Sequence, residues 1–326
     1  MFRQAKPLFL IVETPLHAGS GSDLGIVDLP IQREKHTGYP KIEASSLKGS
    51  IREIFDTQAV TNKLTGIVFG PEQGNLHAGA LGFTDARLLL FPVKSVSGVF
   101  AWVTCPAVLE RFKHDLSICQ PSIELVENLP GGNSVTDDST LIVKDGKIVL
   151  EEYTFTVSPD KECEAVAKWI AENTLPPDSG YDYWREKMKR DVAVLSDDDF
   201  RDFVTLSTEV VARTKIDNKT GTVVGGALWY EEYLPTDSIL YSLALTTPLF
   251  LKVDGVDDEK EKKGIFYAGQ GPDKNRMEAE KVMAFFADEL PDIIQVGGNA
   301  TVGKGLVRTR MYRDGGEKDV AKSDNT

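Results

Sequence analysis

Apolar and polar residues follow distinct patterns along the first part of the chain, and each pattern predicts one element. Residues 7–14 are almost continuously apolar, which is typical of a central strand buried on both faces. Residues 45–55 carry apolar side chains at helical spacing and predict an amphipathic helix. Its apolar face is formed by Leu47, Ile51, Ile54 and Phe55. Residues 79–93 and 98–112 predict two more strands, the second of which continues into a helix near Pro106.

The second half of the chain predicts a long hairpin followed by a strand, a helix and two more strands. Residues 208–235 alternate between two faces around a turn at 217–221 that is rich in turn-forming residues. Residues 238–251 predict a strand, and residues 276–290 predict an amphipathic helix. Residues 293–312 then predict a strand, a glycine-rich loop and a last strand.

The order of these elements predicts the fold class. A strand, a loop, a helix and two strands precede a large insertion, and a helix and a strand follow the hairpin, which is compatible with a ferredoxin-like α+β core. The insertion, at about 105–205, is expected to contain two helices and a short hairpin, at 165–173, 196–204 and 145–157. We therefore predict one domain over residues 1–314 with this insertion and the hairpin at about 208–235, and a flexible tail at 315–326.

Residues 15–44 are the exception, because neither a helical nor a strand period passes through them. Loops of this length without secondary structure of their own are uncommon in compact domains and are often functional. The segment contains Asp28, followed by a charged run at 33–36. We expect the apolar side chains of its first half to anchor it by burial. These are Leu24, Ile26 and Val27.

The composition narrows the class of protein. The chain has 326 residues, 41% of them hydrophobic, and a net charge of −13, which argues against a general nucleic-acid binder while leaving room for a local basic groove. Its three cysteines include no C-x-x-C pair, which argues against a disulfide framework or a zinc site and favours a reducing compartment. No apolar stretch approaches the length of a membrane span, so we expect a soluble cytoplasmic protein with no membrane partner.

The start of the first predicted helix has the chemistry of an anion site. Ser46, Lys48 and Arg52 lie there, with Ser45 or Ser46 as the expected N-cap. A helix N-terminus presents N–H groups and the positive end of the helix dipole, both of which attract phosphate. A capped amphipathic helix with solvated cations is the alternative, and the pattern alone favours that alternative by about two to one.

The glycine-rich loop and the hairpin are the two other candidates for contact with a phosphate backbone. Glycines let backbone amides approach an anion closely, and the loop adds two cations. Its candidate residues are Gly297, Gly298, Lys304 and Arg308. Gly305 occupies the position at which a Walker A loop has Ser or Thr, so that motif is absent. A flexible turn is the likelier alternative on pattern alone.

In the hairpin, alternation places Arg213 and Lys215 on one face together with Val211. These two cations are suited to lie against a strand of nucleic acid. Two alternatives stay open for the hairpin. One is a paired arm whose charges are solvated, and the other is an arm that braces a neighbouring subunit.

Four residues suggest catalytic chemistry without forming a recognisable motif. Asp28, in the sequence VDLP, is more often a turn-forming residue than a catalyst, and His17 fits an ordinary loop histidine. Glu231 and Tyr233 belong to the run YEEY, for which a solvated strand end is the plain interpretation. No Ser-His-Asp spacing and no H-E-x-x-H motif accompanies them.

The sequence ETPLHAGSGSDLGIVDLPIQREKHTGYPKIEASSLKGSIREIF closely resembles the backbone subunits of Cmr-type (type III-B) CRISPR effector complexes. Those subunits are RRM-like proteins of the RAMP superfamily that bind guide RNA. GGNATVGKGL resembles the glycine-rich loop of the superfamily, and RTKIDNKTGTVVGGALWYEEYLP resembles its thumb hairpin. The resemblance covers most of the chain and is weakest at 105–205. It implies an RRM-like form of the ferredoxin-like core with a thumb hairpin.

The resemblance also implies a function. Copies of the chain would line up head-to-tail along one guide RNA, together with other subunits of a Cmr-type complex, and each thumb would displace a base at regular intervals. A complementary target RNA would be cut opposite each displaced position, in a reaction that needs a divalent metal such as Mg²⁺ or Mn²⁺. The resemblance makes Asp28 the catalytic residue and a possible metal ligand. His17, Glu231 and Tyr233 match further proposed active-site positions.

Three other functions remain compatible with the sequence. The chain would act as a structural RNA-binding filament subunit if cutting took place elsewhere in the complex. It would act as a stand-alone endoribonuclease that processes guide RNA if the isolated chain cut precursor repeat RNA, although such enzymes often use histidines and no convincing histidine pair is present. An unrelated acidic α+β enzyme with a small anionic substrate would carry no RNA and stay monomeric.

Overall fold

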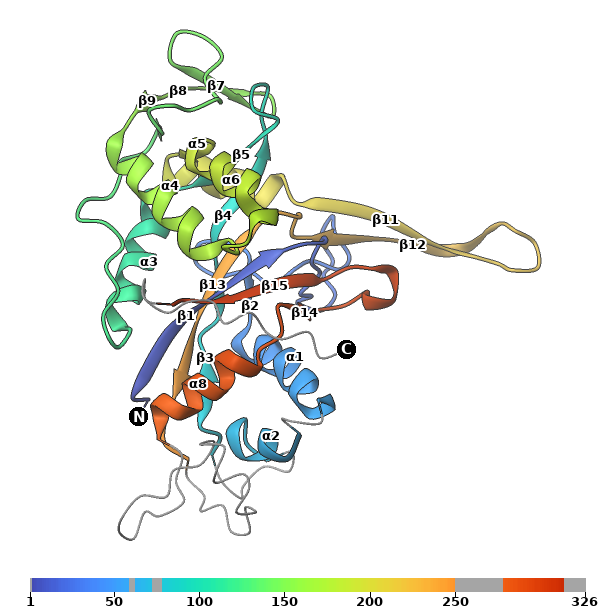
Figure 1. Cartoon of the computed structure of the whole chain (residues 1–326). Helices are drawn as coiled ribbons and strands as arrows, with labels where there is room; N and C mark the ends of the chain where they lie inside the picture. Colours follow the sequence, from blue (N-terminus) through green and yellow to red (C-terminus); the bar gives the residue numbers. More distant parts are fainter. Residues whose placement is uncertain (1, 59–61, 72–77, 250–277, 314–326) are drawn as a thin grey trace.

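The computed structural model describes residues 2–58, 62–71, 78–249 and 278–313 of the chain. Within them, the core is a sheet flanked by helices (Figure 1). The six core elements are, in chain order, β1 (Gln4–Val12), α1 (Ala44–Thr57), β4 (Ala86–Lys94), β13 (Ile239–Thr246), α8 (Ala279–Glu289) and β15 (Leu306–Met311). The predicted tail at 315–326 and the end of the strand expected at 238–251 lie outside the described residues.

The strand order of the core confirms the ferredoxin-like prediction. The strands lie in the order β15-β1-β13-β4, and each neighbouring pair is antiparallel. This is the order of the β-α-β-β-α-β motif, with the insertion and the thumb placed between its second and third strands. β1 is central and its residues are almost all buried, as its continuous apolar pattern predicts. β3 (Leu81–Phe83) and β2 (Lys41–Ile42) extend the pairing at two places.

The insertion extends the same sheet instead of forming a separate layer, which its sequence does not predict. β5 (Phe100–Thr104) pairs with β4, and the short strand β10 (Val192–Val194) pairs with β5 in parallel. The other elements of the insertion are α3 (Pro106–Ile118), β6 (Ser134–Val135), β7 (Lys147–Leu150), β8 (Tyr153–Thr156), β9 (Ser158–Pro159), α4 (Lys161–Thr174), η1 (Ser179–Tyr181), α5 (Asp182–Arg190) and α6 (Asp197–Leu206). The predicted helices and hairpin of this region are therefore confirmed.

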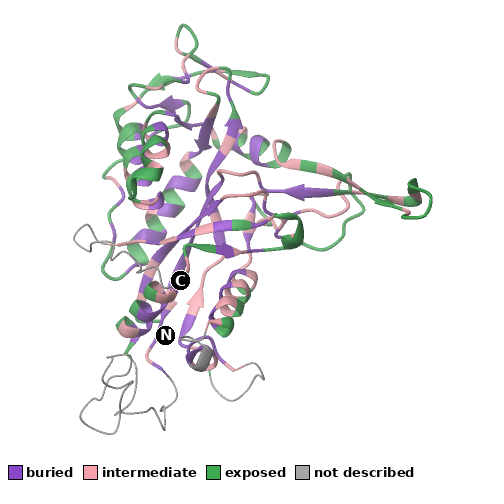
Figure 2. Ribbon diagram, turned by 45° about the vertical axis from the view of Figure 1, so that its right-hand side comes forward, coloured by how far each residue is buried: buried purple, intermediate pink, exposed green. Residues whose placement is uncertain are grey.

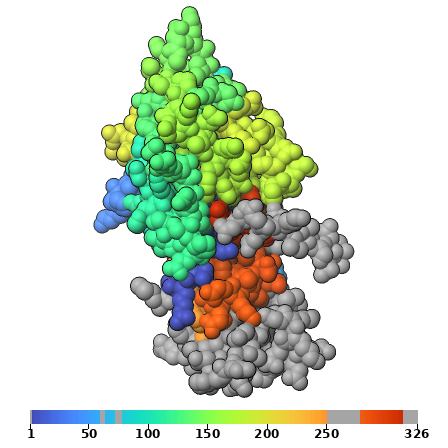
Figure 3. All heavy atoms as spheres, turned by 60° about the vertical axis from the view of Figure 1, so that its left-hand side comes forward, coloured from blue at the N-terminus to red at the C-terminus, as the bar shows by residue number. Residues whose placement is uncertain are grey.

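The insertion and the core share one hydrophobic interior. Phe9 of β1, Phe112 of α3 and Trp169 of α4 contact one another edge to face, with ring centroids 5.6 to 6.4 Å apart. In the view of Figure 3 the insertion, in green, forms the upper part of the molecule, with the start of β1 in blue and α8 in orange below it. The division of the chain into the predicted segments stays a prediction.

The thumb is the predicted hairpin, formed by β11 (Glu209–Ile216) and β12 (Val223–Tyr233). The turn is closed by Asp217, whose Oδ1 accepts from the backbone N–H groups of Lys219 at 2.7 Å and Thr220 at 3.2 Å. The hairpin projects far from the sheet, and its exposed outer part contrasts with its buried base (Figures 1 and 2). The base is the part that meets the rest of the molecule.

The aperiodic segment at 15–44 is ordered by backbone hydrogen bonds. The Ser20 N–H donates to Pro30 O at 3.0 Å and the Gln32 N–H donates to Ala18 O at 2.8 Å, so residues 18–32 fold back on themselves as a short hairpin. The expected burial of its first half is wrong, because Leu24 and Ile26 lie at the tip of this fold and are 105% and 95% exposed. The loop is anchored by its backbone and by polar contacts at the thumb base.

Candidate functional site

The thumb base brings together four side chains on one face of the hairpin. Strand alternation puts Trp229, Glu231 and Tyr233 on that face of β12, and the register adds Arg213, which lies opposite Trp229. Arg213 donates from Nε to Glu231 Oε2 at 3.2 Å and from Nη2 to the Tyr233 hydroxyl at 3.0 Å. Trp229 donates from Nε1 to the other oxygen of Glu231 at 2.8 Å. The interpretation of YEEY as a solvated strand end is wrong, since Glu231 and Tyr233 are both buried.

The glycine-rich loop closes over this face of the thumb. It lies between β14 (Ile293–Gln295) and β15, with a single turn of helix, η2 (Ala300–Val302), at its tip. Asn299 adopts a left-handed backbone conformation and donates from Nδ2 to Glu231 Oε2 at 3.0 Å and to the Tyr233 hydroxyl at 2.9 Å. Lys304 lies with Nζ 5.1 Å from the centre of the Tyr233 ring. The loop is thereby fastened to the hairpin.

His17 completes the cluster from the third side. Its ring centroid lies 5.6 Å from that of Tyr233, and its Nδ1 lies 2.7 Å from Glu232 O. Because a carbonyl oxygen only accepts, Nδ1 carries the hydrogen in this contact. The backbone of His17 also packs against the glycine loop, where the Gly298 N–H donates to His17 O at 3.0 Å. The structure thus brings together His17, Glu231, Tyr233, Arg213 and Lys304, which the sequence placed in three separate candidate groups.

The cluster holds Glu231 ionised. Burial alone raises the pKa of this carboxyl, but the hydrogen bonds from Tyr233, Trp229 and Arg213 outweigh burial and hold the pKa below its ordinary value. The pKa of Tyr233 is raised, first by burial and then by the carboxylate beside it. Glu231 is therefore a structural anion with several donors around it, and it is poorly placed to accept a further proton at neutral pH.

Asp28 lies beside the same strand through a different set of contacts. Its Oδ2 accepts from the Tyr230 N–H at 2.7 Å. The next residue, Leu29, donates to Tyr230 O and accepts from the Glu232 N–H, both at 3.0 Å, so the loop runs parallel to β12 at this point. The Asp28 side chain is half-buried. The structure therefore places Asp28 at the thumb base, one strand position from Glu231.

Asp28 is the one carboxylate here that suits a divalent metal. Within the described residues, no group of three His, Cys, Asp or Glu side chains is arranged to hold a metal ion. Glu231 is already engaged by Arg213, Tyr233, Trp229 and Asn299. Mg²⁺ is commonly held by one or two carboxylates together with substrate phosphates and water, so a single aspartate such as Asp28 would hold it only together with ligands from a substrate.

The start of α1 differs from its prediction. The helix begins at Ala44 with Glu43 as its N-cap residue, so the expected cap at Ser45 or Ser46 is wrong. The reason is a tertiary contact: Asp85 of the β3–β4 connection accepts from the Ala44 N–H at 2.9 Å. Asp85 thereby supplies the negative charge that a helix N-terminus attracts. Ser46 instead accepts from Gln32 Nε2 at 3.4 Å, which links the helix to the Asp28 loop.

Three of the four remaining predicted cations have protein partners. Lys48 donates to Leu81 O at 2.9 Å, and burial together with the neighbouring Arg52 lowers its pKa. Arg52 forms an ion pair with Asp56 at 3.3 Å, and Arg308 forms one with Glu13 at 2.6 Å. Lys215 is exposed farther out on the thumb. The structure brings none of these four into the cluster around Glu231, and their contact with RNA stays a prediction.

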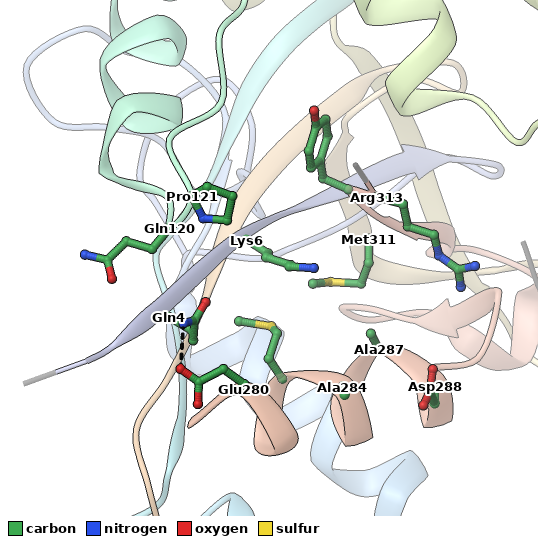
Figure 4. A pocket seen from close by; sticks show the side chains of 12 residues that line it. Gln4, Lys6, Gln120, Pro121, Glu280, Ala284, Ala287, Asp288, Met311 and Arg313 are labelled. Carbon is green, nitrogen blue, oxygen red and sulfur yellow. Dashed lines mark hydrogen bonds between the residues drawn. The ribbon is translucent and has the colours of Figure 1, made fainter. Parts of the chain in front are cut away.

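A cavity of about 700 Å³ lies elsewhere, between β1, α8 and the end of β15 (Figure 4). Gln4 donates from Nε2 to Glu280 Oε1 at 2.9 Å beside it, and Met283 and Met311 form part of its apolar wall. None of the predicted site residues is among the described residues that line it. The predicted catalytic residues instead gather at the thumb base, which is therefore the candidate site.

A family model for the RAMP superfamily matches residues 9–308, which is most of the chain. The chain belongs to the RAMP superfamily. The chain is also 38% identical over 303 residues to the CRISPR system Cmr endoribonuclease Cmr4 of Pyrococcus furiosus, covering 91% of this chain and 92% of that protein. These matches confirm the resemblance to Cmr backbone subunits.

Solved structures agree with the RAMP fold. The crystal structure of oligomeric Cmr4 from Pyrococcus furiosus superimposes with a TM-score of 0.66 at 31% identity, covering 95% of this chain and 98% of that one. A chain in the cryo-EM structure of the type III-B Cmr-beta complex bound to cognate target RNA superimposes with a TM-score of 0.69. This second match has 24% identity and covers 95% of this chain and 98% of that one, and it supports the fold alone.

Two residues of the thumb base were missed by sequence reasoning. Asn299 and Trp229 take part in its contacts but were not singled out, and Arg33 was noted only as part of the charged run at 33–36. Trp229 could have been predicted from the sequence, because it alternates with Glu231 and Tyr233 along one strand. Asn299 follows a Gly-Gly pair, which suggests a left-handed position, but its partners lie 66 and 68 residues away and no local pattern gives them.

Proposed function

We propose that this chain is the guide-RNA-binding backbone protomer of a type III-B CRISPR effector complex and that it cleaves complementary target RNA. The observation that carries the proposal is the hydrogen-bonded position of Asp28 at the base of the thumb. The extensive identity to a protein named as a Cmr endoribonuclease supports it. We propose a cytoplasmic location for the assembly, which fits three buried free cysteines.

The RNA-binding part of the proposal needs only contacts to backbone and shape. In RNA-guided effectors base pairing reads the sequence, so the protein has to hold the guide and displace selected bases. The exposed part of the thumb carries Lys215, which supplies local positive charge in a chain whose net charge is −13, while Arg213 is paired with Glu231 at the thumb base. Head-to-tail contacts whose rotation does not close build a filament along the guide. The oligomeric crystal form of the relative supports self-association.

The cleavage step uses the target RNA as its own nucleophile. A base displaced by the thumb splays its neighbour, so that a 2′-OH is brought in line with the adjacent phosphorus. The 2′-oxygen forms a bond to phosphorus, the bond to the 5′-oxygen breaks, and the leaving oxygen takes up a proton. Asp28 accepts the proton of the 2′-OH, or it would be the residue that holds a divalent metal. A bound Mg²⁺ or Mn²⁺ would offset the negative charge that develops there.

None of the helices in the described part of the chain has the length and apolar character that a membrane crossing requires. The partners we propose are guide RNA, target RNA, further copies of the chain and other subunits of the complex. In a stand-alone processing enzyme the isolated chain would cut precursor repeat RNA. We expect no such cutting, because the proposed scissile geometry forms only where guide, target and thumb meet.

The first prediction tests Asp28 in the assembled complex. Asp28→Asn removes the negative charge but keeps an oxygen that accepts from the Tyr230 N–H. We expect the single-turnover rate of target cleavage to fall by about 10²-fold or more, while guide binding and assembly are retained. Cleavage is measured on labelled target RNA under excess complex.

Asp23→Asn is the matched control, because Asp23 lies in the same loop and its Oδ1 accepts from the Leu24 N–H at 2.7 Å. It should leave the cleavage rate within about twofold of wild type, as expected of an exposed surface change. An assembled Asp28→Asn complex that cuts at the wild-type rate would show that the chain is a structural subunit without catalysis.

A further inference from the structure

The loop that carries Asp28 is fastened to the thumb by one buried acid, Glu232. Its side chain is 5% exposed. Oε2 accepts from the Ile31 N–H at 3.0 Å, and Oε1 accepts from Arg33 Nη2 at 2.5 Å and from the Thr208 hydroxyl at 2.7 Å. One carboxylate therefore joins the loop, the residue before β11 and the strand β12.

Arg33 extends this connection to two more segments. Its Nη1 donates to Gly38 O at 2.7 Å, where the loop turns back, and to Val204 O at 2.9 Å, near the end of α6. Its Nη2 is used by Glu232. The planar guanidinium is suited to such divergent, directed contacts, which a lysine ammonium would not reproduce. The pair thus fixes both ends of the loop segment 31–38 relative to the thumb base.

Glu231 and Glu232 contact different loops because their side chains lie on opposite faces of β12. Glu231 faces the glycine loop, where Asn299 reaches it, and Glu232 faces the loop that carries Asp28. Asp28 itself meets the strand one position before Glu231, where its side chain accepts from the Tyr230 N–H. Its place is therefore set by how residues 28–33 lie against β12.

We propose that Arg33 and Glu232 are positioning residues that hold Asp28 at the thumb base, so that the place of the thumb strand sets the place of the catalytic carboxylate. The inference rests on the proposed function, in which Asp28 serves cleavage. It adds that the base-displacing element and the catalytic loop move as one body. A thumb that is seated between bases then brings Asp28 to the phosphate beside the displaced base.

The loop's attachment is tested first without RNA, in the full chain. Glu232→Gln keeps an oxygen for the Ile31 N–H but loses the ion pair with Arg33, and Arg33→Lys keeps the charge but loses the divergent donors. We expect hydrogen exchange at the Leu29 and Ile31 amides to speed up by about tenfold or more in both variants, since local opening becomes easier. The amides of β1 should keep their protection, which shows that the core is folded.

Glu34→Gln is the matched control for these variants. Glu34 follows Arg33 directly, but its carboxylate accepts from the Thr37 hydroxyl at 2.8 Å and lies 3.6 Å from Arg87 and 3.8 Å from Arg111, and these three partners lie outside the thumb. Exchange at Leu29 and Ile31 should stay as in wild type. An unchanged exchange rate in Glu232→Gln, or an equal rise in Glu34→Gln, would overturn the proposed attachment.

The functional arm uses complexes assembled with guide RNA. We expect Glu232→Gln and Arg33→Lys to lower the single-turnover cleavage rate by about tenfold or more with target affinity unchanged, because small misplacements of a catalytic group are costly. The double variant should be no slower than the worse single variant, as two residues of one contact predict. Glu34→Gln should cut at the wild-type rate.

The outcomes separate this inference from the function it rests on. A loosened loop with wild-type cleavage, in a complex that Asp28→Asn inactivates, would overturn the positioning role and leave the proposed function standing. Wild-type cleavage by Asp28→Asn would overturn the proposed catalytic role and the positioning role together. A parallel loss of loop protection and cleavage rate, confined to the Arg33 and Glu232 variants, would support both.

Discussion

At the scale of the residue, Glu231 shows how a carboxylate can be buried without being neutralised. Four donors surround it: Arg213, Trp229, Tyr233 and Asn299. Leaving such donors unpaired would cost more than the carboxylate's own burial, which is why the pKa of Glu231 lies below its ordinary value in spite of burial. The charge of Glu231 is thus part of what joins the thumb to the glycine loop.

This lowered pKa makes a prediction about pH. Because the pKa of Glu231 is lower in the folded chain than in the unfolded one, its ionised form stabilises the fold at pH values above its ordinary pKa of 4.5. That contribution is lost as the pH falls through the lower, folded pKa. We expect Glu231→Gln to be less stable than wild type at pH 7 and the difference to shrink below pH 4.5. Urea unfolding at several pH values measures this difference.

Glu280→Gln is a suitable control for this titration, because Glu280 is exposed and its carboxylate accepts a hydrogen bond from the neutral side chain of Gln4. Its difference from wild type should be small and nearly independent of pH. A Glu231→Gln difference that stays constant from pH 7 down to pH 3 would contradict the ionised state assigned to Glu231.

At the scale of the element, the glycine loop shows that two adjacent glycines have different structural roles. Gly297 has a φ of +77°, and a Cβ built on it would lie 2.2 Å from His17 O. A Cβ on Gly298 would lie 3.6 Å from the His17 ring, which is an ordinary contact. Gly297 is therefore required for the loop to pack against the backbone of His17, while Gly298 is not.

This difference predicts a large loss of stability for one alanine substitution and a small change for its neighbour. Gly297→Ala combines a left-handed backbone with overlap against a backbone oxygen, so we expect it to lower the free energy of unfolding by about 2–4 kcal/mol. Gly298→Ala should change it by less than about 1 kcal/mol. Urea unfolding of both variants measures the contrast, and equal losses would show that the loop conformation differs from the one described.

Sequence patterns predicted the elements better than their ends or their long-range partners. Alternation correctly placed Arg213 on one face of the thumb, and there it meets Glu231 and Tyr233. The cap of α1 was missed because an aspartate from another connection, Asp85, supplies it. The exposure of Leu24 was missed for a related reason, since apolar character alone does not reveal that backbone pairing holds a loop away from the core.

At the scale of the whole molecule, the sheet is a ferredoxin-like core that the insertion lengthens on one side. The antiparallel core was predictable because its strands and helices are long and periodic. The extension was not, since β10 and β6 have only three and two residues and carry too little pattern to show which strand they join. In the thumb, by contrast, the base forms part of the candidate site and the outer part is mostly exposed to solvent.

We predict that the outer thumb is dispensable for the stability of the rest. Replacing residues 214–228 by a two-residue Asn-Gly turn keeps Arg213, Trp229 and everything closer to the sheet. Because the removed side chains are mostly exposed, the thermal midpoint of the chain should change by less than about 2 °C. Differential scanning calorimetry measures it. A much larger decrease would mean that the outer thumb packs against the body.

The central place of β1 in the sheet affects how the chain is made. β1 leaves the ribosome long before the two strands that hydrogen-bond to it, β13 and β15, are synthesised. For most of translation this buried, apolar strand has neither edge covered, and its native contacts all span a long stretch of sequence. Such contacts form slowly and leave apolar strand surface open to aggregation, so the nascent chain depends on protection until its last strand emerges.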